Sequence, residues 1–67
     1  MNEDKERLRH LLEHWVEHNK SHRESFKDWL TKSEKMGLNS VAKKLKEAVD
    51  ANDEVIKSLQ RALKEIK

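Results

Sequence analysis

The sequence predicts an all-α protein, an antiparallel hairpin of two long helices over about residues 3–36 and 40–66. Three observations predict this class. Apolar residues recur at intervals of three and four along almost all 67 residues, which is the repeat of one face of an α-helix. Proline is absent and glycine occurs once, whereas a chain of short strands needs both residues at its turns. Cysteine is also absent, which excludes a small fold held together by disulfides.

The first helix is predicted over about residues 3–36. Asn2 is a suitable N-cap, and Glu3 and Asp4 follow in the first turn, where the helix dipole favours anions. Its apolar residues occupy an arc of roughly 160° on a helical wheel. They are Leu8, Leu11, Leu12, Trp15, Val16, Phe26, Trp29, Leu30 and Met36. One face of this helix is therefore expected to pack and the rest to meet water.

The stretch 18–25 holds no apolar residue, and it leaves an alternative open. A break near residues 19–22 would give a three-helix bundle. We favour continuity because the spacing keeps its phase from Trp15 through Asn19 and His22 to Phe26, whereas a loop usually shifts that phase. The prediction is one helix of about 34 residues, about 50 Å long.

The junction and the second helix follow from the next residues. Gly37 suits the left-handed position that ends a helix in a Schellman motif, with Leu38 after it. Asn39 or Ser40 is expected to cap the second helix. Its apolar residues, interrupted only by Asn52, are Val41, Leu45, Ala48, Val55, Leu59, Ala62 and Ile66. Residues 1–67 are thus predicted to form a single helical domain.

The apolar stripes are too wide for a lone hairpin to cover. Each helix shields only part of the other, so Trp15 and Trp29 are expected to remain in water. Small scaffolds without disulfides commonly oligomerise, and we expect a homodimer that forms an antiparallel four-helix bundle. The residues predicted at interfaces are Trp15, Trp29, Phe26, Asn19 and Asn52. Core packing within one chain is the alternative role for the two tryptophans.

Four histidines recur at four-residue intervals, so they lie on successive turns of the first helix. A neighbouring pair can chelate a divalent ion, and neutral imidazole suits zinc, nickel and cobalt. His14 and His22 are ~12 Å apart along the axis, so one helix cannot bring three histidines to one ion. Further ligands would come from Glu17, Asn52, the other helix or a second chain. The predicted metal ligands are His14, His18, His22, Glu17 and His10.

A purely structural role for the histidines also remains open. His10 and His14 are predicted to be exposed, His18 to lie at the edge of the apolar stripe and His22 inside it. With Asn19, His22 would then be a polar core residue that fixes the register of the helices. A layer of Ser25, His22 and Asn52 would select one antiparallel pairing.

The segment Leu11–His22, followed by Phe26, Trp29 and Gly37-Leu38, resembles a group of short, largely uncharacterised prokaryotic helical domains. Their pattern is Leu-x-His-Trp-[Ile/Val]-x-His-Asn-x-x-His, and the similarity covers nearly the whole chain. It implies that the following residues form one motif: His14, Trp15, His18, Asn19 and His22. Some domains of this group accompany metal-uptake or histidine-rich proteins, so the resemblance favours nickel, cobalt or zinc. His10 lies outside the motif and is the weakest ligand candidate.

Other function classes find little support in the sequence. There is no glycine-rich phosphate loop and no cysteine nucleophile, so we expect no enzyme. Fifteen basic and thirteen acidic residues give a net charge of +2, and no face gathers the basic ones, so a nucleic-acid partner is not expected. No apolar run approaches a membrane span and the first ten residues are mostly charged, so we expect a cytoplasmic protein with no membrane partner. Two functions remain: divalent-metal handling or sensing, and non-catalytic dimerisation or protein interaction.

Overall fold

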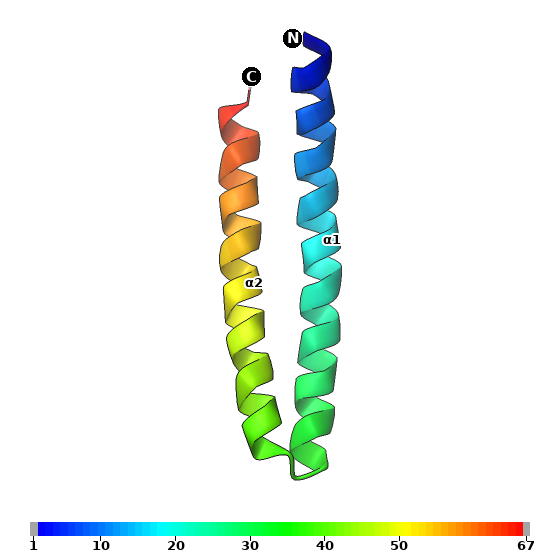
Figure 1. Cartoon of the computed structure of the whole chain (residues 1–67), viewed down its shortest axis with the longest axis vertical. Coiled ribbons are helices and arrows are strands. Elements are labelled where there is room, and N and C mark those ends of the chain that lie inside the picture. Colours follow the sequence, from blue (N-terminus) through cyan, green and yellow to red (C-terminus); the bar gives the residue numbers. More distant parts are fainter. Residues whose placement is uncertain (1, 67) are drawn as a thin grey trace.

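A computed structural model describes residues 2–66, which form two α-helices joined by a short turn. Helix α1 spans Asn2–Lys35 and helix α2 spans Asn39–Glu65. The helices run antiparallel and bring both ends of the chain to the same end of the molecule (Figure 1). The described residues include no strand. The all-α hairpin is therefore confirmed, with each predicted boundary displaced by one residue.

Helix α1 continues without a break through the polar stretch 18–25, so the three-helix alternative is wrong. The side chain of Asn19 makes a hydrogen bond within this continuous helix. Its Nδ2 donates a hydrogen bond of 2.7 Å to the backbone carbonyl of Trp15, one turn earlier. Asn19 thus bonds within its own helix, instead of capping the start of a new one.

The turn at Gly37 ends α1 in the predicted Schellman motif. The N–H of Leu38 donates to the carbonyl of Ser33 at 2.9 Å, and the N–H of Gly37 donates to that of Glu34 at 3.0 Å. Gly37 has a φ of 77°, a left-handed conformation that glycine adopts without strain. The motif therefore accounts for the shortness of the connection to α2.

The expected capping of α2 by Asn39 or Ser40 is wrong. The N-cap is Leu38, whose side chain makes no capping hydrogen bond, and its carbonyl accepts a bond of 3.0 Å from the N–H of Ala42. The chain passes directly from Gly37 into the cap position, so Asn39 is already the first residue of α2. Leu38 thus completes the motif that ends α1 and is also the N-cap of α2.

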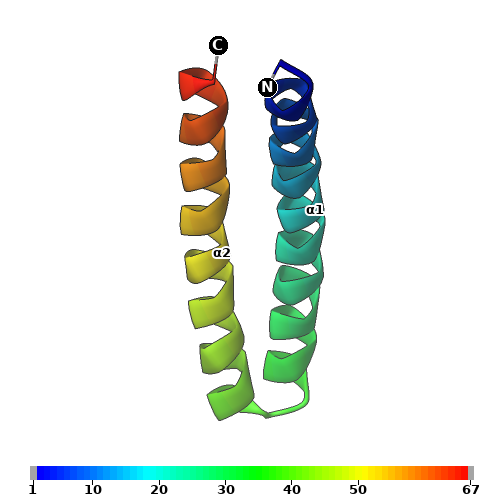
Figure 2. The same ribbon diagram turned by 45° about the horizontal axis from the view of Figure 1, so that its top comes forward.

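The core is one thin line of side chains between the two helices. Its buried residues are Leu12, Val16 and Ser33 of α1 and Ala42, Val49 and Ile56 of α2. Helix α2 lies beside α1 along its length (Figure 2), and α1, with 34 residues against 27, extends past the C-terminal end of α2. The radius of gyration is 15.6 Å, whereas a compact chain of this length has one of about 11 Å. Much of each apolar stripe consequently has no covering layer within the chain.

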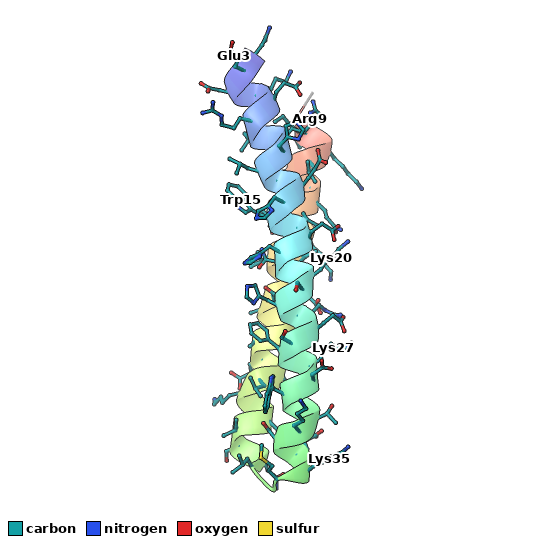
Figure 3. All side chains as sticks on the ribbon, turned by 90° about the vertical axis from the view of Figure 1, so that its right-hand side faces the viewer. Glu3, Arg9, Trp15, Lys20, Lys27 and Lys35 are labelled. Carbon is teal, nitrogen blue, oxygen red and sulfur yellow. The ribbon has the colours of Figure 1, made fainter. Side chains whose placement is uncertain are left out.

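Charged side chains cover much of the remaining surface. Lys20, Lys27 and Lys35 project from one side of α1 and Trp15 from the other (Figure 3). The ion pairs within each helix, such as Lys44 with Glu47 at 3.3 Å, involve exposed side chains and add little stability. In the part of the chain that the structure describes, no helix combines the length and hydropathy of a bilayer-crossing segment.

Candidate functional site

An apolar surface of exposed and half-buried side chains follows one side of the hairpin, and we call it the apolar face. It consists of Leu8, Leu11, Trp15, Phe26 and Trp29 of α1, with His18 and His22 among them, and Val41, Leu45, Ala48, Val55 and Leu59 of α2. Trp15 is 39% exposed, Trp29 54% and Val41 48%. The expectation that a lone hairpin leaves both tryptophans in water is therefore confirmed.

The two stripes lie on the same side of the molecule. On each helix the exposed stripe is offset from the buried line by roughly a quarter turn, at ~100° per residue, in the same sense along the chain. Because α1 and α2 run in opposite directions, equal offsets turn both stripes towards one side. The described charge next to this face is the ammonium of Lys32, whose Nζ lies over the Trp29 ring, 4.3 Å from its centroid. The face thus has the character of a contact surface.

His18 and His22 occupy the middle of the α1 stripe and form a close pair. Their Nε2 atoms are 2.8 Å apart, and the ring centroids are separated by 4.3 Å at an interplanar angle of 86°. Without metal, the Nε2–H of one ring donates to the Nε2 of the other. Nitrogens about 2.0–2.1 Å from a zinc ion are about 2.9 Å apart at a right angle and about 3.3 Å apart in a tetrahedron. The spacing of the two nitrogens thus suits one ion, and each ring would have to rotate to turn its Nε2 lone pair from the other ring towards that ion.

The other predicted ligands are not part of this pair. His14 stacks on His18 with a centroid distance of 5.8 Å, so its ring is adjacent. The carboxylate of Glu17 lies 3.8 Å from Nζ of Lys20. His10 is exposed and precedes the stacked series that begins at His14. Among residues 2–66, no cluster of three or more His, Cys, Asp or Glu residues has the spacing to hold a metal ion.

His22 is exposed, although it lies within the apolar stripe as predicted. The stripe around it lies roughly a quarter turn from the side of α1 that packs on α2, and its ring stacks on that of Phe26 at 6.1 Å. The predicted layer of Ser25, His22 and Asn52 does not form, because Asn52 bonds to Asn19 instead. Asn19 is about 60° around α1 from His22, on the side nearer α2.

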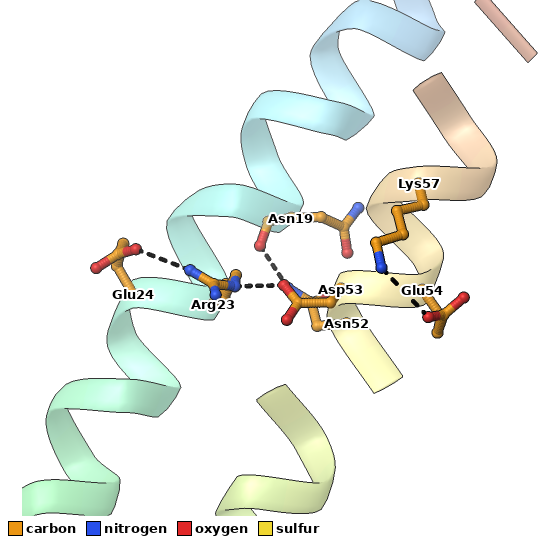
Figure 4. Close-up of polar contacts among 7 residues, drawn as sticks. All are labelled: Asn19, Arg23, Glu24, Asn52, Asp53, Glu54 and Lys57. Atoms are coloured by element: carbon orange, nitrogen blue, oxygen red, sulfur yellow. Dashed lines mark hydrogen bonds and ion pairs between the residues drawn. The ribbon is translucent and has the colours of Figure 1, made fainter. Parts of the chain in front are cut away.

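The Asn19–Asn52 contact sets the relative height of the two helices (Figure 4). Nδ2 of Asn52 donates a hydrogen bond of 2.6 Å to the backbone carbonyl of Asn19. One turn away, Nε of Arg23 donates to Oδ1 of Asp53, and both side chains are about one-third exposed. The level of residue 20 in α1 therefore coincides with that of residue 52 in α2. Both asparagines, predicted at interfaces, meet here within one chain.

Sequence reasoning missed the Arg23–Asp53 pair. The available signal was weak: opposite charges directly beside the stripes, Arg23 one turn after Asn19 and Asp53 next to Asn52.

Two open grooves, of about 310 and 370 Å³, lie away from the apolar face. The first is lined by Lys20, Arg23, Glu24, Asp53 and Ile56. Side chains of both signs line it, so it presents no single charge to a ligand.

Comparison with known proteins identifies the family but no activity. An uncharacterised protein of the archaeon Archaeoglobus fulgidus is 48% identical over 58 residues, which cover 87% of this chain and 92% of that protein. No solved structure matches the chain significantly. The model of a family described as a domain of unknown function, DUF8180, matches residues 8–66. The matched segment includes the four histidines, the turn and all of α2, and the chain belongs to this DUF8180 family.

Proposed function

We propose that the protein binds a divalent transition metal ion, zinc, nickel or cobalt, through His18 and His22 and serves metal handling or sensing. The observation that carries this proposal is the 2.8 Å separation of the two Nε2 atoms. Both rings are exposed, so an ion reaches them without any opening of the fold. Neutral imidazole nitrogens are preferred ligands of these metals.

His14 and Glu17 are the supplementary ligands within the chain. The ring of His14 already stacks on that of His18. Glu17 would have to leave Lys20, and an exposed ion pair of this kind costs little to break. The Leu-x-His-Trp-[Ile/Val]-x-His-Asn-x-x-His pattern that the sequence resembles includes His14, His18 and His22. This supports a shared role of the three histidines in metal binding. His10 is outside that motif and provides a control.

Calorimetric titration with Zn²⁺ or Ni²⁺ tests the proposal. Because His18 and His10 are both exposed, replacement of either by alanine should leave the hairpin folded. His18→Ala should weaken binding by more than about tenfold, since even changes around the ligands cost 10–100-fold. His10→Ala should leave binding nearly unchanged. Absence of heat at micromolar metal, or equal losses in the two variants, would remove the proposal.

A second candidate function is a non-catalytic dimerisation or protein-interaction module with no physiological metal. The observation that favours it is the apolar face, with Trp15 and Trp29 exposed by 39% and 54%. It predicts a melting temperature that rises with protein concentration and that a chelator leaves unchanged. The metal-binding proposal predicts a melting temperature that rises with added zinc.

A further inference from the structure

We propose that a second copy of this chain covers the apolar face about a two-fold axis at the level of residue 20 in α1 and residue 52 in α2. The His18–His22 pairs of the two copies would then form a single four-nitrogen metal site. The metal part rests on the proposed function, whereas the choice of partner and axis rests on the arrangement of the face.

The α1 half of the apolar face is nearly symmetric about residue 20. His18 and His22 lie two residues to either side, and Leu11 and Trp29 lie nine residues to either side. Trp15 and Phe26 lie five and six residues away. Antiparallel packing of α1 on the partner's α1 would therefore place Leu11 against the partner's Trp29, and Trp15 against the partner's Phe26.

The α2 half is similarly symmetric about residue 52. Leu45 and Leu59 lie seven residues to either side, and Ala48 and Val55 lie four and three residues away. The two centres of symmetry have the same height because Asn52 donates its hydrogen bond to Asn19. A single two-fold axis perpendicular to the helices therefore places each stripe against the same stripe of the second copy. A self-complementary dimer interface requires this arrangement.

Charge and size both favour a second copy as the occupant. Each chain carries a net charge of +2, and Nζ of Lys32 lies over the Trp29 ring of the apolar face, 4.3 Å from its centroid. Because Lys32 is twelve residues from the axis, the Lys32 ammonium groups of the two copies would be about 36 Å apart along the helices and would not repel strongly. The Cα extents of 52 Å and 14 Å outline a long, narrow face, along which a second hairpin of the same dimensions fits.

The histidine pair is incomplete as a metal site without this copy. It offers two nitrogens, whereas structural zinc sites have four ligands in a tetrahedron. The axis at residue 20 passes between His18 and His22, so it brings the partner's pair to the same point. Two pairs supply four neutral nitrogens from exposed rings that need only rotate about their side-chain bonds.

Spin-label distances and metal stoichiometry on the full chain test this arrangement. The chain has no cysteine, so a nitroxide can be attached to a single one at exposed Lys35 or Ser21. Lys35 is fifteen residues from the axis, which places its labels about 45 Å apart along the helices. The Ser21 labels should lie within about 20 Å, because packed helices are 8–10 Å apart. Zn²⁺ should bind at one ion per two chains.

The outcomes separate this inference from the proposed function. Lys35 labels as close as the Ser21 labels would show that the turns lie at the same end, and would overturn the axis. One ion per chain, or a monomer with bound metal, would overturn the shared site and leave metal binding intact. No binding of Zn²⁺ or Ni²⁺ would overturn the shared site and the proposed function together. The doubly substituted H18A/H22A chain should still dimerise and bind no metal.

Discussion

The side-chain amide of Asn52 donates a hydrogen bond of 2.6 Å to the backbone carbonyl of Asn19, which ties the middle of α2 to the middle of α1. The ion pair of Arg23 with Asp53 lies one turn away. A slip of the helices would separate both pairs of groups. Buried or half-buried polar contacts of this kind fix the register of packed helices more than they add to stability.

Replacement of Asn52 by alanine should lower the stability by about 1 kcal/mol, because it removes one half-buried hydrogen bond. In a chain of this size the melting temperature should fall by about 4–8 °C. Thermal unfolding followed by circular dichroism measures the change. Asn39→Ala is the matched control and should change little, since Asn39 is exposed at the start of α2. Equal losses in the two variants would show that the contact does not stabilise the hairpin.

Replacement of Gly37 by alanine should cost about 1–2 kcal/mol, since an L-residue with a side chain is strained at a φ of 77°. No neighbouring atom lies within 4 Å of an added Cβ, so the loss comes from the backbone conformation alone. Gly37→Asn should cost less, because asparagine tolerates the left-handed region. Denaturant unfolding distinguishes the two variants, and a more stable alanine variant would contradict this explanation of the turn.

Trp29→Glu should prevent self-association and leave the hairpin helical. Trp29 is 54% exposed in the single chain, but a carboxylate there would be buried by a partner on the apolar face. The dimer dissociation constant should rise by at least about tenfold, or 1.4 kcal/mol. Thr31→Glu makes the same change of charge at an exposed position away from the face. Sedimentation equilibrium provides the measurement, and similar behaviour of the two variants would argue against association through this face.

The sequence predicted the hairpin because its signals are local. The unbroken phase from Trp15 to Phe26 marked one helix, and Gly37 followed by Leu38 marked the turn. The cap of α2 was missed because the Schellman motif places Leu38 at that position, where propensity alone prefers Asn39 or Ser40. Context from the preceding helix thus overrode a local preference.

Less of the candidate site could be predicted. Four-residue spacing identified neighbouring histidines, but side-chain rotation decides that His18 meets His22 while His14 only stacks. The partner of Asn52 depends on the crossing of two helices, which a helical wheel does not specify. A helical wheel gives the width of the apolar stripe of α1, but it does not show which part of that stripe α2 covers. The exposure of His22 could therefore not be predicted from the wheel.

Metal affinity should fall as the pH drops below about 6.5, where ordinary imidazoles become protonated, because a bound metal needs neutral rings. The direction follows from competition between protons and metal for the same nitrogens. Zn²⁺ titrations at pH 7.5 and pH 5.5 measure the difference. Equal Zn²⁺ affinities at pH 7.5 and pH 5.5 would indicate that carboxylates bind the metal rather than His18 and His22.

The ring signals of the four histidines in a nuclear magnetic resonance titration with Zn²⁺ test the role of the histidine pair most directly. We predict that the signals of His18 and His22 shift at micromolar metal, while those of His10 remain in place. Unchanged signals of His18 and His22, with or without shifts elsewhere, would contradict metal binding by the pair.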